Sequence, residues 1–126
     1  MASIIVMSGN HKGDYYPLGR RTTVIGRDEA LLIQILDEGV SRKHVQIHFD
    51  KDTGEYYALD MKSRNGVFVN NEKIDDETVL MDGDHIRLGQ TVLFFTKKDF
   101  PNYEDAMTHF KKAGQRVNRT KPIEAQ

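Results

Sequence analysis

The sequence predicts an all-β fold, in which short antiparallel strands form a sandwich, on three observations. Apolar residues alternate with polar ones in several segments, as at Val45, Ile47 and Phe49, which is typical of half-buried strands. Other segments, such as 22–25, are β-branched throughout. Turn sequences rich in Gly, Asn and Asp recur at intervals of roughly 6–12 residues. About ten short strands at this spacing are typical of a β-sandwich.

The individual strands follow from the same pattern, taken between successive turns. Nine of them are expected at residues 3–7, 15–18, 22–25, 32–36, 45–49, 56–59, 67–69, 86–88 and 92–96. Residues 50–54 are expected to form a hairpin loop, because Asp, Thr and Gly are turn residues. Asn70-Asn71 and Asp82-Gly83 are expected to be tight turns.

Length and composition exclude several classes of protein. A chain of 126 residues fits one domain with a single core. Its net charge of -1 argues against a general polyanion binder, which would be strongly basic. The absence of cysteine excludes disulfides and thiolate metal sites. The apolar run 4–7 is too short for a signal peptide core, and no stretch reaches the length of a membrane span. We therefore expect a cytoplasmic protein that does not engage a membrane.

We assign residues 1–99 to the sandwich. After them the strand pattern of the sequence gives way to a helical one. Pro101 and Asn102 are typical of a helix start, and acidic residues follow in the first turn, where negative charge is favoured. Four apolar residues then share one helical face: Tyr103, Ala106, Met107 and Phe110. We expect residues 100–113 to form an amphipathic helix packed on or beside the sandwich, with a partner-binding helix as the alternative. Residues 114–126 are expected to be a flexible basic tail.

Several polar segments fall at expected strand ends and loops and carry the functional signal. They are Gly26-Arg27, Ser41-Arg42-Lys43-His44, Asp60, Ser63-Arg64-Asn65-Gly66 and Asn70. Each is weakly specific alone, but the ordered set resembles the forkhead-associated (FHA) domain over roughly residues 4–97. The resemblance implies an eleven-strand antiparallel β-sandwich that binds phosphothreonine peptides and needs no cofactor.

The resemblance places Arg27, Ser41 and Asn65 at the phosphopeptide. Phosphothreonine carries about -1.5 to -2 charges and three acceptor oxygens, and a planar guanidinium can meet two of these oxygens at once. The Ser41 hydroxyl can donate to another oxygen, and the Asn65 amide can both donate to and accept from a peptide backbone. The alternatives are an ion pair of Arg27 with a neighbouring carboxylate, a self-bonded turn at Ser41, and Asn65-Gly66 as a turn that needs positive φ.

Three further residues, Arg42, Ser63 and Arg64, complete the expected phosphopeptide-binding set. For Arg42, a phosphate contact and a solvated side chain remain equally open. FHA domains often carry Thr or Ser immediately before the asparagine, whereas this chain has Arg64 there and Ser63 one position earlier. Arg64 either supplies a second guanidinium to the phosphate or points to solvent.

Gly26, His44, Gly66 and Asn70 are expected to support the binding loops. Gly26 is expected to let the backbone turn tightly at a strand end. The resemblance implies that His44 braces the loops and that Asn70 fixes a neighbouring one. A metal site is not expected, because the chain has no cysteine and His48, on the same strand face as His44, does not complete a ligand set.

Together these features predict a phosphothreonine-reading adaptor that acts in Ser/Thr kinase signalling, below an upstream Ser/Thr protein kinase. The main alternative is an interaction sandwich that ignores phosphate. Catalysis is not expected, because the acidic residues lie in turns, where acids are common, and Ser41 and His44 are poorly spaced for a triad. Specific nucleic-acid binding is not expected either, although the basic tail could touch a phosphate backbone weakly. Thr120 in that tail could be phosphorylated and bound by the chain itself, and the helix or the tail could support self-association.

Overall fold

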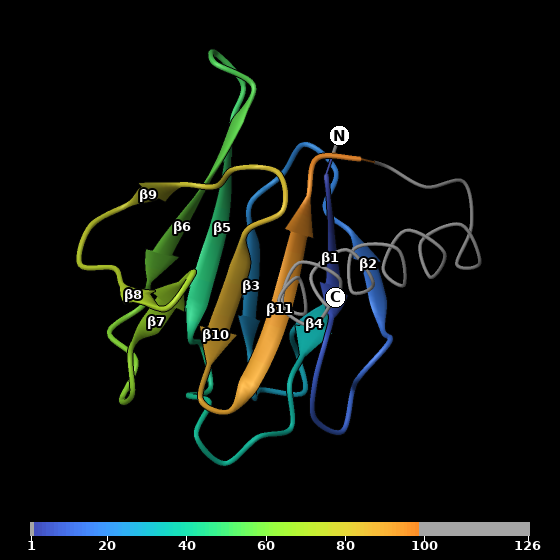
Figure 1. The fold of residues 1–126 in the computed structure, drawn as a ribbon, viewed down its shortest axis with the longest axis vertical. Helices are drawn as coiled ribbons and strands as arrows, with labels where there is room; N and C mark the ends of the chain where they lie inside the picture. The colour runs from blue at the N-terminus through green and yellow to red at the C-terminus, as the bar shows by residue number, and fades with distance from the viewer. Residues whose placement is uncertain (1, 99–126) are drawn as a thin grey trace, which may run out of the picture.

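The computed structural model of the chain describes residues 2–98. They form eleven strands in two sheets that pack face to face, as Figure 1 shows. The predicted all-β sandwich is confirmed. The expected helix over 100–113 and the expected tail over 114–126 lie outside the described residues. Within 2–98, no helix has the length and apolar character needed to cross a membrane.

One sheet has six strands, in the order β2-β1-β11-β10-β7-β8, and all of its pairs are antiparallel. Its strands are β1 (Ser3–Val6), β2 (Tyr15–Pro17), β7 (Val67–Val69), β8 (Glu72–Lys73), β10 (His85–Leu88) and β11 (Thr91–Thr96). The first and last strands of the described chain are neighbours, with Ser3 opposite Thr96.

The other sheet has five strands, in the order β4-β3-β5-β6-β9. Its strands are β3 (Thr23–Gly26), β4 (Ile33–Gln34), β5 (Val45–Asp50), β6 (Glu55–Asp60) and β9 (Thr78–Val79). The pair β3–β4 is parallel, with Ile25 opposite Ile33, and departs in this detail from the antiparallel expectation. The other pairs are antiparallel.

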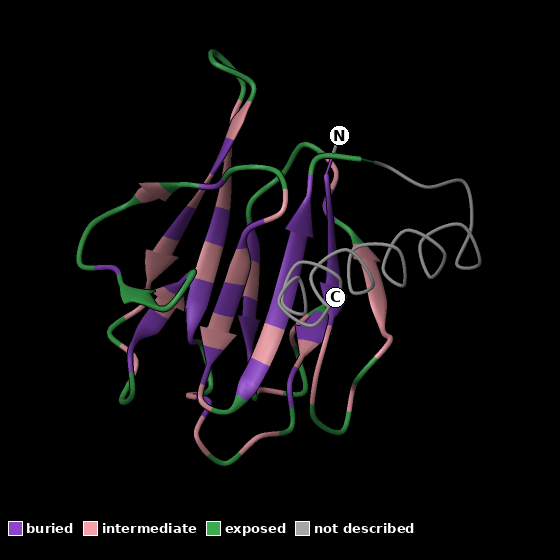
Figure 2. Cartoon of the chain, in the orientation of Figure 1, coloured by how far each residue is buried: buried purple, intermediate pink, exposed green. Residues whose placement is uncertain are grey.

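The core lies between the two sheets, where alternate residues of each strand point inward. Ile4 and Val6 of β1, and Leu93 and Phe95 of β11, are fully buried and belong to one apolar cluster. Figure 2 shows buried residues along the central strands and exposed residues in the loops. Burial of each large apolar side chain contributes roughly 1.5–3 kcal/mol, so this core holds the strand ends and their loops in place.

Two strands carry no signal in the hydrophobic pattern. β8 and β9 have two residues each, and their residues are exposed or half-buried. They are strands because β8 pairs with β7 and β9 pairs with β6. The local sequence pattern does not predict this pairing. The expected strand over 32–36 shortens to β4, because Leu32 and Leu36 are 63% and 53% exposed at its flanks.

The loops that carry the predicted polar residues gather at one end of the sandwich, which we call the loop end and which is drawn at the bottom of Figure 1. β3 runs to this end at Gly26, and the antiparallel β5 starts from it at Val45. β6 returns there at Asp60, which pairs with Val45. The β4–β5 loop (35–44) and the β6–β7 loop (61–66) therefore lie together.

Candidate functional site

The β4–β5 loop joins the three side chains that the sequence singled out for peptide binding. Asn65 donates from Nδ2 to the Gly39 carbonyl at 2.8 Å. Arg27 donates from Nε to the Val40 carbonyl at 3.0 Å. Ser41 is the next residue in the same loop. The guanidinium, the carboxamide and the hydroxyl therefore meet on three consecutive residues of one loop, although they come from three separate stretches of sequence.

Gly26 ends β3 directly against the backbone of the β4–β5 loop. A Cβ at this position would lie 2.0 Å from the Arg42 carbonyl oxygen, which is closer than any real contact. This approach extends the strand ladder, because Arg27 N–H donates to the Ser41 carbonyl at 3.0 Å and Asp28 N–H to the Arg42 carbonyl at 3.2 Å. Gly26 is not among the residues with positive φ, so close packing, and not the expected tight turn, requires glycine here.

The Arg27 side chain is exposed, and its direction is set by the Nε bond to Val40. In the part of the chain that the structure describes, no carboxylate forms an ion pair with it. The neighbouring Asp28 carboxylate instead accepts from Ala30 N–H at 2.9 Å. The terminal guanidinium nitrogens are thus available to an anion in a planar fork.

His44 fastens the β4–β5 loop to the β6–β7 loop from a fully buried position. Ser41 N–H donates to His44 Nδ1 at 2.9 Å, so Nδ1 is the acceptor and Nε2 carries the hydrogen. Nε2–H then donates to the Gly66 carbonyl at 2.8 Å. One neutral imidazole thereby joins the loop of Ser41 to the loop of Asn65, and this geometry agrees with the bracing role that the resemblance implied.

Replacing His44 with phenylalanine keeps the volume of the ring and removes both hydrogen bonds. We expect the free energy of unfolding to fall by about 2–4 kcal/mol, because the partly buried Ser41 N–H and the buried Gly66 carbonyl lose their partners. The measurement is chemical denaturation. His48→Phe is the matched control, because His48 is half-buried on β5, the strand that follows His44, and its ring hydrogen-bonds the exposed Thr22 hydroxyl at 3.1 Å and not a buried backbone group. Equal losses in the two variants would contradict the bracing role.

The Ser41 hydroxyl joins the same two loops. Its Oγ accepts from Arg64 N–H at 3.0 Å, so the hydroxyl hydrogen remains available to a ligand oxygen. The Arg64 side chain spans the gap as well, with Nη2 donating to the Glu38 carbonyl at 3.0 Å. Arg42 is exposed next to Ser41. Three exposed arginines, Arg27, Arg42 and Arg64, therefore stand on the loops that adjoin the Ser41 hydroxyl, which makes this rim favourable for a dianion.

Ser63 stabilises the loop that carries Asn65. Its N–H donates to Asp60 Oδ1 at 3.0 Å, and its Oγ accepts from Gly66 N–H at 3.0 Å. Gly66 has a φ of +84°, in the left-handed region that favours glycine. The half-buried Ser63 thus shapes the turn of the β6–β7 loop, whereas Asn65 is exposed at its tip.

Asn70 lies away from the loop end, at the other end of β7. It has a φ of +51° and begins the turn to β8. Its Nδ2 donates to Asp84 Oδ1 at 2.9 Å, and its Oδ1 accepts from His85 N–H at 2.9 Å. Asn70 therefore ties the β7–β8 turn to β10, and both of these side-chain bonds lie away from the loops around Ser41.

A hollow of about 880 Å³ opens beside Asn65, between the β4–β5 loop and the β10–β11 turn. Leu36, Glu38 and Arg87 contribute side chains to its lining. The exposed Leu36 adds an apolar surface, and Arg87 and Glu38 add opposite charges. This hollow offers space for a chain segment that passes over Asn65.

Asp37 holds the two walls of this hollow together. Its Oδ1 accepts from Gly39 N–H at 2.8 Å, and its Oδ2 accepts from Gln90 N–H at 2.9 Å and from the Thr91 hydroxyl at 2.8 Å. Burial alone would raise the pKa of Asp37, but these three hydrogen bonds to the ionised form outweigh it and lower the pKa below its ordinary value.

Replacing Asp37 with asparagine should loosen the contact between the β4–β5 loop and the β10–β11 turn. We expect a loss of about 1 kcal/mol in the free energy of unfolding at pH 7, discounted for solvent exposure. Because the folded-state pKa is lowered, the contribution of Asp37 is present above its unfolded-state pKa and is lost as pH falls through its folded-state pKa. The difference between the two proteins should therefore disappear in acid, as urea denaturation across pH 2–7 would measure. A difference that does not change with pH would contradict this account.

The role of Asp37 has no signal in the local sequence, where Asp37-Glu38-Gly39 indicates only a turn. Its partner Gln90 is 53 residues away, so the contact exists only in the folded sandwich. Among residues 2–98, no group of three or more His, Asp or Glu is arranged to hold a metal ion.

The fold and the loop end together define a β-sandwich binding module, and comparison with known proteins gives its family. The family model described as FHA domain matches residues 23–89, which include the whole of the β4–β5 and β6–β7 loops. The chain belongs to the FHA domain family. Its eleven-strand sandwich is the fold of that family's solved structures.

Two curated relatives place the match in context. The glycogen accumulation regulator GarA of Mycolicibacterium smegmatis is 35% identical over 94 residues, which is 75% of this chain and 58% of GarA. The FHA domain-containing protein FhaA of Mycobacterium tuberculosis is 37% identical over 90 residues, which is 71% of this chain and 16% of FhaA. The chain thus spans less than two thirds of the length of these relatives.

Two solved structures share the fold at similar identity. An FHA domain from a structural and functional analysis of phosphothreonine-dependent interactions superposes with a TM-score of 0.69 at 30% identity, covering 79% of this chain and 98% of that one. The FHA domain of FhaA, in complex with the intracellular domain of another protein, superposes with a TM-score of 0.67 at 32% identity, covering 75% of this chain and 99% of that one.

Proposed function

We propose that the chain binds phosphothreonine-containing segments of partner proteins at its loop end and acts as an adaptor in Ser/Thr kinase signalling. The observation that carries this proposal is that Arg27 and Asn65 bond to Val40 and Gly39 of the β4–β5 loop, directly next to Ser41 in the same loop. Membership of the FHA family supports the ligand class.

The phosphate group is assigned to the arginine rim. Arg27 approaches with its terminal nitrogens, because its Nε is held by Val40, and a planar fork can meet two phosphate oxygens. The Ser41 hydroxyl donates a hydrogen bond to the third phosphate oxygen. Arg64 and Arg42 add positive charge at the rim, and Ser63 acts through the turn that it holds.

The peptide backbone is assigned to Asn65. Its Oδ1 and its second amide hydrogen remain available, because Nδ2 uses one hydrogen on Gly39. The residues that follow the phosphothreonine would then run across the hollow lined by Leu36, Glu38 and Arg87. This arrangement makes the site a reader of a phosphorylated peptide and not of free phosphate.

The expected affinity follows from the number of contacts. Three or four charge-assisted hydrogen bonds contribute roughly 1.5–3 kcal/mol each. Association costs at least about 4 kcal/mol. At the upper end, four bonds of about 3 kcal/mol against a cost of about 4 kcal/mol leave about 8 kcal/mol, which corresponds to a dissociation constant on the order of 1 μM. Binding of this strength or weaker suits reversible recognition of a mark that a kinase adds.

An oriented library of phosphothreonine peptides tests the function and gives the flanking preference. The best peptide is then titrated in its phosphothreonine, phosphoserine and unphosphorylated forms at two salt concentrations. We expect binding of the phosphothreonine form that persists at the higher salt concentration and no measurable binding of the unphosphorylated form. Equal binding of the phosphorylated and unphosphorylated forms would overturn the proposal and favour a phosphate-independent interaction module.

A phosphate on the chain itself is a second source of ligand. Thr120 lies in the basic stretch Asn118-Arg119-Thr120-Lys121, outside the described residues. We propose that a kinase can modify Thr120 and that the loop end then binds it within one chain or between two. Mass spectrometry of kinase-treated protein, followed by sedimentation, tests this, and the absence of modification at Thr120 would end the idea.

A further inference from the structure

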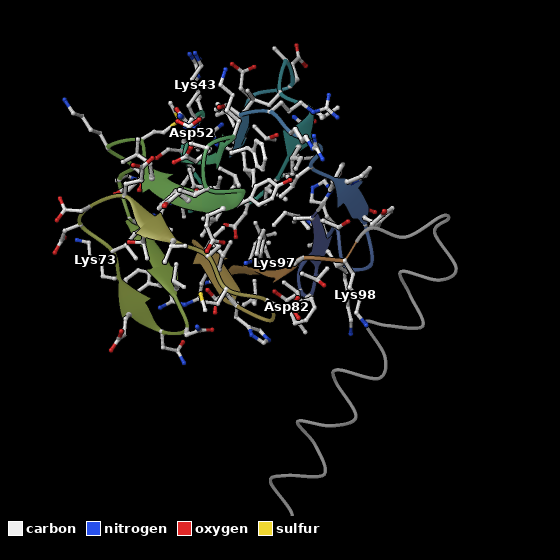
Figure 3. The ribbon with its side chains drawn as sticks, turned by 90° about the horizontal axis from the view of Figure 1, so that it is seen from above. Lys43, Asp52, Lys73, Asp82, Lys97 and Lys98 are labelled. Carbon is white, nitrogen blue, oxygen red and sulfur yellow. The ribbon has the colours of Figure 1, made fainter. Side chains whose placement is uncertain are left out.

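The end of the sandwich opposite the loop end carries a second hollow, of about 750 Å³. Three segments converge on it: residues 20–22 before β3, residues 49–54 around the β5–β6 hairpin, and Lys97 after β11. Figure 3 looks down on this end and labels Asp52 on the hairpin and Lys97 after β11. We call this site the basic hollow.

Half of the residues that line the basic hollow are cations, and none of them is acidic. The cations are Arg20, Arg21, Lys51 and Lys97. This concentration is notable in a chain whose net charge is -1. Like charges gathered around one concavity repel each other, so the free protein is penalised for this arrangement and a bound anion would relieve the penalty.

The basic hollow has an ordered floor. Phe49 contributes a half-buried ring, which packs on Tyr56 with 4.9 Å between ring centroids. Arg21 is held in place because its Nε donates to the Leu18 carbonyl at 3.0 Å, which leaves its terminal nitrogens for an anion. Thr22 adds a hydroxyl group at the rim.

The cations of the basic hollow are accessible. Within residues 2–98, Arg20 and Lys51 form no ion pair, and both are exposed. Lys97 pairs with Glu55 at 2.8 Å, but both groups are substantially exposed, and an exposed pair of this kind exchanges easily for another carboxylate.

Carboxylates outside the hollow limit what can bind there. Asp52 lies on the hairpin tip, Glu55 lies beside Lys97, and Asp82 accepts from Lys97 N–H at 2.8 Å. A long polyanion such as a nucleic-acid strand would have to pass these negative charges. A short acidic peptide segment can place two or three charges on Arg20, Arg21 and Lys51, which form no ion pair within residues 2–98.

We propose that the basic hollow is a second binding site, which takes a short acidic segment of a partner protein. It lies at the end opposite Arg27, Ser41 and Asn65, so it can be occupied independently of them. A single chain can thereby hold two segments at once, on one partner or on two. This proposal does not depend on phosphothreonine binding at the loop end.

The test is an NMR titration of the full chain with a hexaglutamate peptide, with hexaglutamine as the uncharged control. We expect saturable shifts of the amide signals of Thr22, Lys51, Gly54 and Lys97, and no comparable shifts at Arg27, Ser41 and Asn65. The double variant Arg20→Gln/Arg21→Gln should weaken hexaglutamate binding about tenfold or more. Lys51→Gln provides a second variant at an exposed position.

The matched control is Lys12→Gln/Lys62→Gln, which removes two exposed cations that do not line the basic hollow. It should leave hexaglutamate binding within about twofold of the parent, since only distant charge is lost. Three results would each overturn the proposal. Hexaglutamate binding could weaken equally in both double variants, or the amide shifts could be confined to the loop end. A ten-nucleotide oligothymidylate could also bind more tightly than hexaglutamate.

Discussion

Replacing Arg27 with alanine is expected to abolish detectable phosphopeptide binding. The variant loses a bidentate, charge-assisted contact worth about 2–4 kcal/mol, which weakens binding roughly 30- to 1000-fold. Because Arg27 is exposed, the fold should remain intact. Calorimetric titration of the preferred phosphothreonine peptide measures the loss, and the denaturation midpoint measures the fold.

Two companion variants separate geometry from charge. Arg27→Lys keeps the charge but loses both the planar fork and the Nε bond to Val40, so most of the loss should persist. Lys12→Ala removes an exposed cation from the β1–β2 loop and should bind like the parent protein. If Arg27→Ala retains partner binding within about twofold, phosphate is not the determinant and the interaction is phosphate-independent.

Replacing Gly26 with alanine is expected to have the largest effect on the fold. The new Cβ would lie 2.0 Å from the Arg42 carbonyl oxygen, 2.7 Å from the Arg42 carbonyl carbon and 2.9 Å from the Ser41 carbonyl oxygen. All three atoms belong to the backbone, so no rotamer change relieves the clash. The end of β3 must separate from the β4–β5 loop, which breaks the two ladder bonds formed by Arg27 and Asp28. We expect a loss of about 3 kcal/mol or more in the free energy of unfolding.

Gly54→Ala is the matched control for this substitution. Gly54 has a φ of +77°, and a Cβ there would meet nothing within 4 Å. This control therefore carries only the conformational cost of a left-handed residue, about 1–2 kcal/mol. Urea denaturation of both variants measures the difference. The Gly26 variant should also lose phosphopeptide binding, since Arg27 and Ser41 both move. Equal destabilisation of the two variants would show that the backbone approach at Gly26 is not a tight constraint.

The hydrophobic pattern of the sequence predicts most of the strands of the sandwich. Alternation at Val45, Ile47 and Phe49, and β-branched runs such as residues 22–25, predict strands because side chains of a strand point to opposite faces in turn. Turn residues at Gly54, Gly83 and the pair Asn70-Asn71 predict the reversals, and each of these residues has positive φ in the structure. The same reasoning fails at β8 and β9, where two-residue strands are made by pairing alone.

The sequence by itself determined the strand frame, the order of the polar loop residues and the family that this order indicates. Only the tertiary structure decided that Asn65 and Arg27 bond to the stretch of the β4–β5 loop that carries Ser41. It also decided that Gly26 serves close packing and that Asp37 reaches across the fold to Gln90. The physical reason is that side-chain periodicity is a local property, whereas a hydrogen bond between residues far apart in sequence depends on how the sheets bring their loops together.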